Sequence, residues 1–475
     1  MGGYRKRSIW HALQPAPGPG LLAGLRGSFQ DMADFESVRI GAAASDELYL
    51  CYLSTLVGSE HLLFSMEPAS GSEDAALIER YVGTKYTEGD LPACVEALCR
   101  GGTVLCTAAS AAGIVLETGD WQQRGVQQPQ TENVIQGPMY AFNECYRTNV
   151  ALLRQRMRTP KLKLWETSVG QVTPVRAGVF YMQGITDEGL VRRVQDQFSK
   201  IEIDGLQDTG ELLRLLGGRS ILLYPLAVTT ERPDRLASSL LGGKLVIIMD
   251  GTPLAIVAPG AFADFWEAAE DRYLTPVIAI FLRMLRFMAL IINLFLPGFY
   301  VAISSVNIDV NRLEISLAAA GSREGVPYPV LVEALLILFL LDCIVEAGVR
   351  LPRTISATVT MVGGVVLGQA IIQANIVSNL LVIVAATTAL TNFIVVDYQM
   401  GLVQRVLKYF VLIGAGVLGI LGLVVCFAVL VVFLSRLESF GVAYLTPAGP
   451  RARTYAGDIL PRFKRRSRAP KGRAG

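Results

Sequence analysis

Three acidic side chains stand in one apolar stretch of this sequence, residues 328–347. They are Glu333, Asp342 and Glu346. A carboxylate is costly inside a lipid bilayer, so it normally faces protein or water there. Asp342 and Glu346 are four residues apart and would share one helical face, whereas Glu333 would point roughly the opposite way. Two acids on one face predict a ring of carboxylates in an oligomer, which would favour cations.

Two glutamines extend this candidate ion path into the next apolar stretch. Gln369 and Gln373 would also share one helical face, and polar side chains at this spacing suit a water-lined path. A structural alternative remains open for the whole set, because polar groups in membrane helices commonly bond to neighbouring helices. Glu346 would then lie at the membrane interface beside Arg350, and Asp342 would form a buried hydrogen bond between helices.

The elements that would position these residues are five apolar stretches after residue 275. Each approaches or exceeds the roughly 20 residues that cross a hydrocarbon core about 30 Å thick. They cover residues 281–306, 328–347, 354–374, 376–396 and 406–434. Arg283 and Arg286, at the start of the first stretch, predict that the chain before it is cytoplasmic.

The basic C-terminal tail conflicts with five full crossings. Residues 462–473 read RFKRRSRAPKGR, and basic segments beside a membrane favour its cytoplasmic side. Five crossings from a cytoplasmic start would leave this tail outside, whereas an even number would keep it inside. We therefore expect that one stretch is not a simple span. The first candidate is 354–374, whose glycines and glutamines suit a re-entrant or pore-facing element.

The chain before residue 275 has the mixed charge of a soluble protein. The full chain has 475 residues, 52% of them hydrophobic, and a formal net charge of +2, which argues against a nucleic-acid binder. No apolar run follows the basic residues near the N-terminus, so we expect no signal peptide. Seven cysteines without a CxxC pair and only two histidines disfavour a metal site or a catalytic dyad. We expect no enzyme, no cofactor and no metal.

Short strands that alternate with helices predict an α/β cytoplasmic region of two small α/β subdomains, followed by an all-α polytopic transmembrane domain. The first subdomain should have strands at 48–54, 103–109 and 113–119 and helices at 72–82 and 91–100. A helix at 143–158 should follow. The second subdomain should have a strand at 175–185, helices at 187–201 and 208–216, and a hairpin over 244–259 that turns at Asp250-Gly251.

The predicted organisation has six parts. They are a mobile N-terminal tail (1–34), the first cytoplasmic α/β subdomain (35–120), a linker with a helix (121–160), the second cytoplasmic α/β subdomain (161–275), the transmembrane helical domain (276–435) and a basic C-terminal tail (436–475).

Nine ordered motifs resemble the A subunits of the GerA-type spore germination receptors, from about residue 90 to residue 447. Before residue 275 they are QQPQTENVIQGP (127–138), NECYRTNVALLRQRMR (143–158), KIEIDGLQDTGELLRLL (200–216), TERPDR (230–235) and VIIMDGTPLAIVAP (246–259). After it they are REGVPYPVLVEALL (323–336), EAGVRLPRTI (346–355), GGVVLGQAIIQANIVS (363–378) and SFGVAYLTP (439–447).

The resemblance implies a spore inner-membrane protein that forms oligomers, contacts membrane lipid, and works with a transporter-like B subunit and a lipoprotein C subunit. The B subunit would hold the nutrient, while this chain would transduce the signal and form a channel for ion release.

The motifs also supply two groups of candidate coupling or structural residues. The groups are Arg323, Glu324 and Pro327 in the membrane half, and Glu231, Arg232 and Asp234 in the soluble half. For the Arg323-Glu324 pair we expect either a salt bridge that orders its loop or a contact with the other membrane subunit.

A second hypothesis keeps the fold and removes the channel. Leu338 stands where the family commonly has an acidic residue, and Gln136 stands where it usually has a basic one. These departures favour a non-conducting scaffold, or a paralogous sporulation membrane protein of the same fold.

Overall fold

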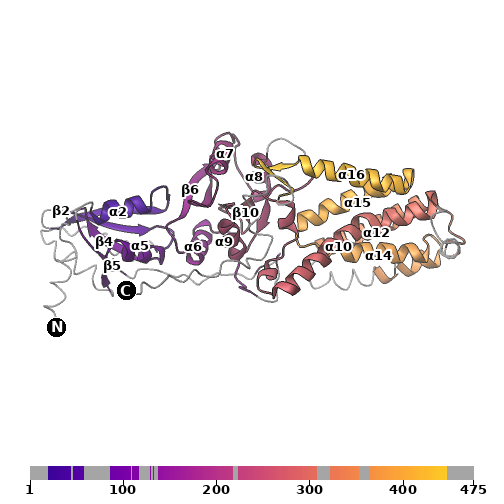
Figure 1. Cartoon of the computed structure of the whole chain (residues 1–475), viewed down its shortest axis with the longest axis horizontal. Helices are drawn as coiled ribbons and strands as arrows, with labels where there is room; N and C mark the ends of the chain where they lie inside the picture. The colour runs from indigo at the N-terminus through magenta and orange to yellow at the C-terminus, as the bar shows by residue number, and fades with distance from the viewer. Residues whose placement is uncertain are drawn as a thin grey trace, which may run out of the picture. The chain divides into compact units, whose positions relative to one another are not determined.

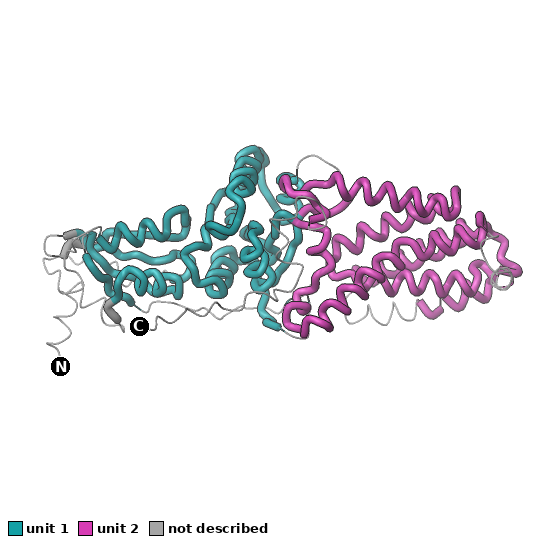
Figure 2. Tube along the Cα trace, in the orientation of Figure 1, with its two compact units in different colours: residues 1–220, 227–259 teal, residues 221–226, 260–475 magenta. Residues whose placement is uncertain are grey.

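The chain folds into two compact units (Figure 2). The computed structural model describes residues 20–43, 46–57, 86–108, 110–116, 129, 132, 137–217, 223–307, 321, 323–351, 364–366 and 368–446. Unit 1 takes its described residues from 1–220 and 227–259, and unit 2 takes them from 221–226 and 260–475. Both predicted α/β subdomains therefore belong to one unit. The helical unit begins at Gly260, sixteen residues before the predicted boundary at 276.

The first sheet of unit 1 has five antiparallel strands in the order β1-β2-β4-β5-β3. Figure 1 labels β2, β4 and β5 of this sheet. The strands are β1 Phe35–Ala43, β2 Asp46–Leu53, β3 Tyr86–Gly89, β4 Thr103–Thr107 and β5 Gly113–Leu116. Helices α2 Leu21–Ser28 and α5 Leu91–Cys99 pack against it. The strands predicted at 48–54, 103–109 and 113–119 and the helix at 91–100 are thus present. The predicted helix at 72–82 lies outside the described residues.

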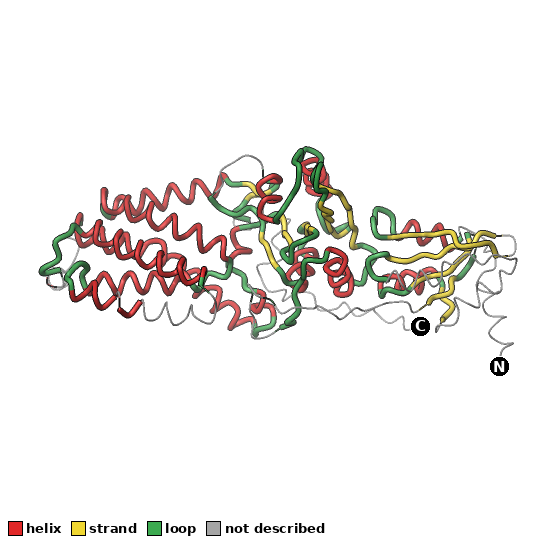
Figure 3. The backbone as a smooth tube through the Cα atoms, turned by 180° about the vertical axis from the view of Figure 1, so that it is seen from behind, coloured by secondary structure: helices red, strands yellow, loops and turns green. Residues whose placement is uncertain are grey.

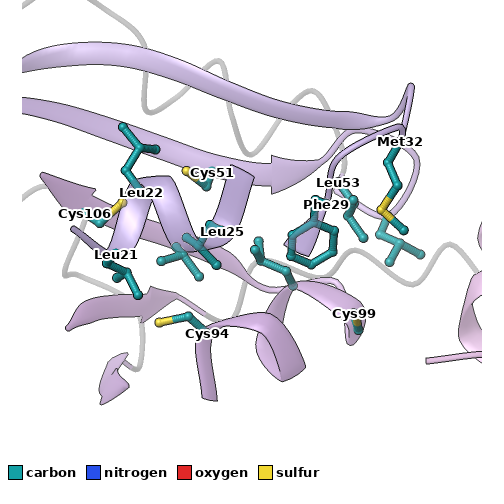
Figure 4. Packing of buried hydrophobic residues seen from close by; sticks show 13 residues of the cluster. Leu21, Leu22, Leu25, Phe29, Met32, Cys51, Leu53, Cys94, Cys99 and Cys106 are labelled. Atoms are coloured by element: carbon teal, nitrogen blue, oxygen red, sulfur yellow. The ribbon is translucent and has the colours of Figure 1, made fainter. Parts of the chain in front are cut away.

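Helix α2 corrects the predicted N-terminal tail of residues 1–34. Leu21 and Leu25 are no more than 4% exposed, and they share a core with Phe29, Cys94 and the strands (Figure 4). Leucines at positions i and i+4 lie on one helical face, which explains the packing. Residues 20–34 therefore belong to the first core and are not a tail.

The second sheet of unit 1 also has five antiparallel strands, in the order β6-β7-β9-β10-β8. The strands are β6 Leu162–Val169, β7 Val175–Met182, β8 Val228–Thr230, β9 Leu245–Met249 and β10 Ala255–Ala258. The helices are α6 Tyr146–Arg156, α7 Glu188–Phe198, α8 Thr209–Leu216 and α9 Pro233–Leu241. The predicted strand, helices and hairpin are present, while β6, β8 and α9 are additional. Asp208 caps α8 by accepting from Gly210 N.

A buried ion pair joins the two sheets within unit 1. Arg154 of α6 donates from Nε and Nη2 to the two carboxylate oxygens of Asp34, each at 2.5 Å. Thr55 Oγ1 also donates to Asp34, at 2.8 Å. Arg154 and Asp34 are 3% and 2% exposed, so the pair is shielded from water. Asp34 follows α2 and Arg154 precedes β6, so the pair links the first core to the second.

Unit 2 consists mostly of helices (Figure 3). They are α10 Pro276–Val301, continued by a π-helical turn at Ala302–Val306, α12 Val330–Arg350, α14 Asn379–Asn392, α15 Tyr398–Leu418 and α16 Ile420–Arg436. Two of these, Pro276–Val306 and Tyr398–Leu418, are long and apolar enough to cross a membrane. Only 28% and 39% of their apolar windows are buried, so most of this apolar surface faces outwards.

The predicted last stretch, 406–434, is two helices rather than one. Gly419 separates α15 from α16 with a φ of +65°, a value that L side chains rarely adopt. Gly414 and Gly422 face each other across the two helices, since a Cβ on Gly422 would meet Gly414 O at 2.0 Å. The two helices therefore form an antiparallel hairpin. Of the suspected re-entrant stretch, 354–363 and 367 lie outside the described residues.

Gly419→Ala is expected to disrupt this hairpin. The new Cβ would lie 1.9 Å from Asn307 Oδ1, which also accepts from Ile420 N at 2.9 Å. Steric conflict combined with a positive φ should cost about 2–4 kcal/mol. The measurement is the amount of membrane-inserted, protease-resistant full chain. Gly401→Ala in α15 is the matched control, because nothing lies within 4 Å of its Cβ position. Equal amounts of both variants would contradict the hairpin.

Candidate functional site

Asp342, the central acid of the candidate ion path, is held in an ion pair between two helices. Lys408 Nζ of α15 lies 3.0 Å from Oδ1 and 2.9 Å from Oδ2 of Asp342 on α12. The neighbouring Tyr409 donates its hydroxyl to the same carboxylate. The side chains of Lys408 and Asp342 are 6% and 23% exposed. The lysine therefore neutralises the acid. The structural alternative expected a buried hydrogen bond between helices, and the structure has an interhelical ion pair whose acid is partly exposed.

Glu346 has a different partner on its own helix. Arg350 Nη2 lies 2.8 Å from Glu346 Oε1, and the two side chains are 77% and 48% exposed. Exposed pairs of this kind contribute little to stability. Asp342 and Glu346 thus share a helical face, but within one chain each is paired with its own cation.

Glu333 ties helix α12 to the start of α14. It is 1% exposed, and its Oε1 accepts from Ser378 N at 2.6 Å. Ser378 is the N-cap residue of α14 and has no side-chain cap of its own. Tyr300 of α10 lies with its hydroxyl 3.2 Å from Ser378 Oγ, so three helices meet here. Glu333 satisfies a helix end, which is a structural role.

The prediction of a salt bridge between Arg323 and Glu324 is wrong. Arg323 Nε lies 3.4 Å from Glu333 Oε2, and Arg323 Nη2 donates to Tyr328 O at 3.1 Å. Glu324 and Pro327 are exposed. The arginine therefore reaches across the loop to α12, because a buried carboxylate needs a cation more than an exposed one does.

Gln369 and Gln373 do not converge with the acids. Both side chains are exposed on the helical residues 368–373. Their place in an ion path remains a prediction, since an oligomer would be needed to bring such surfaces together.

An amide cluster inside the helical unit was missed by the sequence interpretation. Asn293 Nδ2 of α10 donates to Asn392 Oδ1 of α14 at 2.9 Å and to Gln404 Oε1 of α15 at 3.0 Å. Asn293 and Gln404 are 1% and 2% exposed. In the sequence, the signal for this cluster was the presence of single amide side chains within otherwise apolar runs. The cluster fixes the register of three helices, as polar contacts between membrane helices do.

The two arginines at the start of the first predicted span also have acidic partners. Arg286 Nη1 lies 2.6 Å from Asp271 Oδ2, and Arg283 Nη2 lies 2.9 Å from Glu267 Oε1. The acids come from the short segment before α10. These pairs fix the first turns of α10 against that segment.

The TERPDR motif of unit 1 fastens the linker. Arg232 is fully buried and forms a two-pronged pair with Asp234, at 3.1 and 2.8 Å. Arg235 Nη1 donates to Glu132 Oε1 at 3.1 Å, while Glu231 Oε1 accepts from Glu132 N at 3.2 Å. Two charged side chains of this short segment thus hold Glu132 of the linker: Arg235 donates to its carboxylate, and Glu231 accepts from its backbone N–H. The motif is therefore a structural clamp within the chain.

Helix α6, which follows the linker, is fixed at its start by a tyrosine. Burial, followed by the nearby Glu166 carboxylate, raises the pKa of the Tyr146 phenol well above its usual value. The phenol therefore keeps its proton and donates to Glu166 Oε1 at 2.8 Å. Asp250, in the turn of the β9–β10 hairpin, accepts from Tyr146 N at 3.0 Å. Asp250, which was predicted as a turn residue, thus also fixes the start of helix α6.

Comparisons with known proteins agree along most of the chain. The profile of the GerA family, described as Bacillus/Clostridium GerA spore germination protein, matches residues 24–471. Spore germination protein B1 of Bacillus subtilis (strain 168) is 36% identical over 347 residues, which cover 73% of this chain and 72% of that protein. Uncharacterized membrane protein YfkQ of the same organism is 30% identical over 423 residues, covering 87% and 82%.

One solved structure is also similar. It is the crystal structure of the N-terminal domain of the A subunit of the Bacillus megaterium spore germinant receptor GerK3. The two are 22% identical, with a TM-score of 0.38, and the match covers 51% of this chain and 94% of that one.

Proposed function

The chain belongs to the GerA family of spore germination proteins, and from this premise we propose that it is a membrane subunit of a nutrient germinant receptor in bacterial spores. It oligomerises and converts germinant binding into ion release as a ligand-gated cation channel. It works in the spore inner membrane with a transporter-like B subunit and a lipoprotein C subunit. Unit 2 is its transmembrane domain, the N-terminal region is cytoplasmic, and the chain catalyses no reaction.

The observation that carries this proposal is the Asp342–Lys408 pair between α12 and α15. The structure contains the paired state, and the proposal adds a second state in which the two helices are apart. While the pair is formed, the acid offers no net charge to a cation. If the helices separate, the acid becomes available. Binding elsewhere in a receptor can favour one of two such states by differential affinity.

The helix hairpin supports the proposed topology. Phe262 N, before α10, donates to Tyr444 O, after α16, at 2.8 Å. The chain therefore leaves the helices on the side from which it entered them. This geometry agrees with an even number of crossings and with a basic tail on the cytoplasmic side.

A specific observation favours the alternative, a non-conducting scaffold of the same fold. Leu338 is 1% exposed and packs in the core of unit 2, where an acid was expected from the resemblance. Within one chain, the remaining polar candidates do not line a common path.

Ion flux from liposomes that contain the full chain, with and without its B subunit, tests the proposal. The double variant Asp342→Asn/Glu346→Gln removes both acids of the predicted ring. A unit charge at about 4 Å changes an ion's energy by about 4 kcal/mol at intermediate dielectric, so cation flux should fall at least about tenfold. Glu188→Gln is the matched control, since the Glu188 side chain is 89% exposed on α7 of unit 1.

Three results are distinguishable. Flux that depends on the two acids, in a double variant that inserts and assembles like the wild type, supports a cation path through them. Flux that is unchanged in the double variant removes the acids from the path but leaves a channel. A correctly inserted and assembled complex without flux favours the scaffold.

A further inference from the structure

The segment after the last helix, Leu437–Thr446, is a small folded element, which we call the C-terminal plug. Strands β11 Glu438–Ser439 and β12 Val442–Ala443 pair antiparallel around Phe440 and Gly441. Both turn residues have positive φ, +50° and +78°. Two positive φ values in a two-residue loop match the twist of a hairpin, although the first usually belongs to Asn, Asp or Gly.

Ser439 fixes the plug by one buried hydroxyl. It is 0% exposed, its Oγ donates to Leu226 O, and it accepts from Gly260 N at 3.1 Å. Gly260 N also donates to Leu226 O at 2.8 Å. A single side chain therefore bridges two backbone segments that are 34 residues apart in sequence.

Tyr444 fills the other half of the plug. It is 0% exposed, and its ring packs against Tyr224, Phe262 and Phe265 at centroid distances of 6.0, 6.3 and 6.2 Å. Tyr224 in turn contacts Phe433 of α16 at 6.1 Å. Burial raises the pKa of Tyr224 to about 12. The plug is thus held by rings as well as by Ser439, and all these contacts lie within unit 2.

Leu226 and Gly260, the two residues that Ser439 bridges, stand at two of the three points where the chain passes from one unit to the other. Leu226 is followed by β8 and Gly260 is preceded by β10, and these strands pair with Val257 opposite Val228. The hydrogen bond from Gly260 to Leu226 extends that ladder. Gly260 also leads into α10. The Leu226–Gly260 contact thus leads to α10 through the chain, and Ser439 adds a second route from the same contact to α16.

We infer that the C-terminal plug couples the Leu226–Gly260 contact to helix α16 within unit 2, with Ser439 as the positioning residue. The inference rests on the proposed function, because it concerns how a signal reaches the helices. A displacement of Leu226 or Gly260 moves α10 through the chain and α16 through the plug. The α15–α16 hairpin then carries the displacement to Lys408, the partner of Asp342.

The test compares Ser439→Ala with wild type in spores whose only germinant receptor contains the full chain and its partners. Potassium release is recorded while a mixture of the standard L-amino acids with glucose is titrated. Loss of the two Oγ bonds should raise the half-maximal concentration roughly tenfold, within the usual range of coupling between sites. The amount of assembled receptor, measured by co-purification, should stay the same. A merely structural role would instead lower release in proportion to assembly.

Three further variants sharpen the result. Ser439→Thr keeps a hydroxyl and should restore the response. Ser435→Ala is the matched control, because Ser435 is exposed and its hydroxyl donates to Val432 O on its own helix. Tyr444→Phe keeps the ring and should also respond normally. A normal dose response in assembled Ser439→Ala receptors would overturn the inference.

Hydrogen exchange separates this inference from the proposed function. If wild-type spores released no potassium, the proposed function would fail while the plug could still be examined in the purified full chain. Ser439→Ala should then speed exchange jointly in peptides around Leu226, Gly260 and the plug. Faster exchange confined to the plug itself would show that Ser439 does not hold the plug to Leu226 and Gly260.

Discussion

Lys408→Met is expected to destabilise the helical unit by about 3 kcal/mol, near the lower end of the cost of leaving one buried charge without its partner. The lower end applies because Asp342, which would lose its cation, is 23% exposed while Lys408 is 6% exposed. The measurement is the free energy of unfolding of the full chain in mixed micelles, titrated with a denaturing detergent. Tyr409 would still donate to the carboxylate but cannot neutralise it.

Two companion variants make this result specific. Asp342→Asn/Lys408→Met removes both charges and should recover most of the lost stability, since no uncompensated charge remains. Arg350→Met breaks the exposed pair with Glu346 and should cost no more than about 1 kcal/mol. Equal losses of unfolding free energy for Lys408→Met and Arg350→Met would show that the interhelical pair stabilises the protein no more than the exposed pair does.

Arg154→Met should destabilise unit 1 by about 3–5 kcal/mol. The substitution leaves the carboxylate of Asp34, a residue 2% exposed, without its cation, while the Thr55 hydroxyl still donates to it. Pulse proteolysis of the full chain in urea measures the loss. Because the pair joins the two sheets of unit 1, cleavage should begin in both sheets at the same urea concentration.

Arg192→Met is the control for this second prediction. Arg192 and Glu188 lie 3.7 Å apart on α7 with side chains 77% and 89% exposed, so the change should be within about 0.5 kcal/mol of wild type. If Arg154→Met changed the stability of unit 1 as little as this control does, the buried pair would not stabilise the connection between the two sheets.

Local patterns predicted the elements whose signals are local. Asp208 marked the start of α8, and the Asp250-Gly251 pair marked the hairpin between β9 and β10. Helix α2 was hidden because glycines surround and interrupt its leucines, so composition indicated a mobile tail. The break at Gly419 was hidden by the opposite effect, because apolar residues continue without interruption through the turn.

The candidate site shows a sharper limit. Sequence spacing correctly placed Asp342 and Glu346 on one helix, and the structural alternative named the partner of Glu346. It could not name Lys408 as the partner of Asp342, because periodicity carries no information across separate helices. For the same reason the predicted partner of Arg323 was wrong. Its acidic neighbour in sequence is exposed, whereas its actual partner, Glu333, is buried and lies ten residues further along the chain.

The pairing of Asp342 with Lys408 also constrains how the protein is made. The lysine follows the acid by 66 residues. At a synthesis rate of about 5–20 residues per second, the ribosome needs about 3–13 s to supply it. During that interval the carboxylate has no ammonium partner, and lipid is the most costly place for it. Helix α12 can therefore form its pair with α15 only after α15 has been translated, so this contact is made late in the synthesis of the chain.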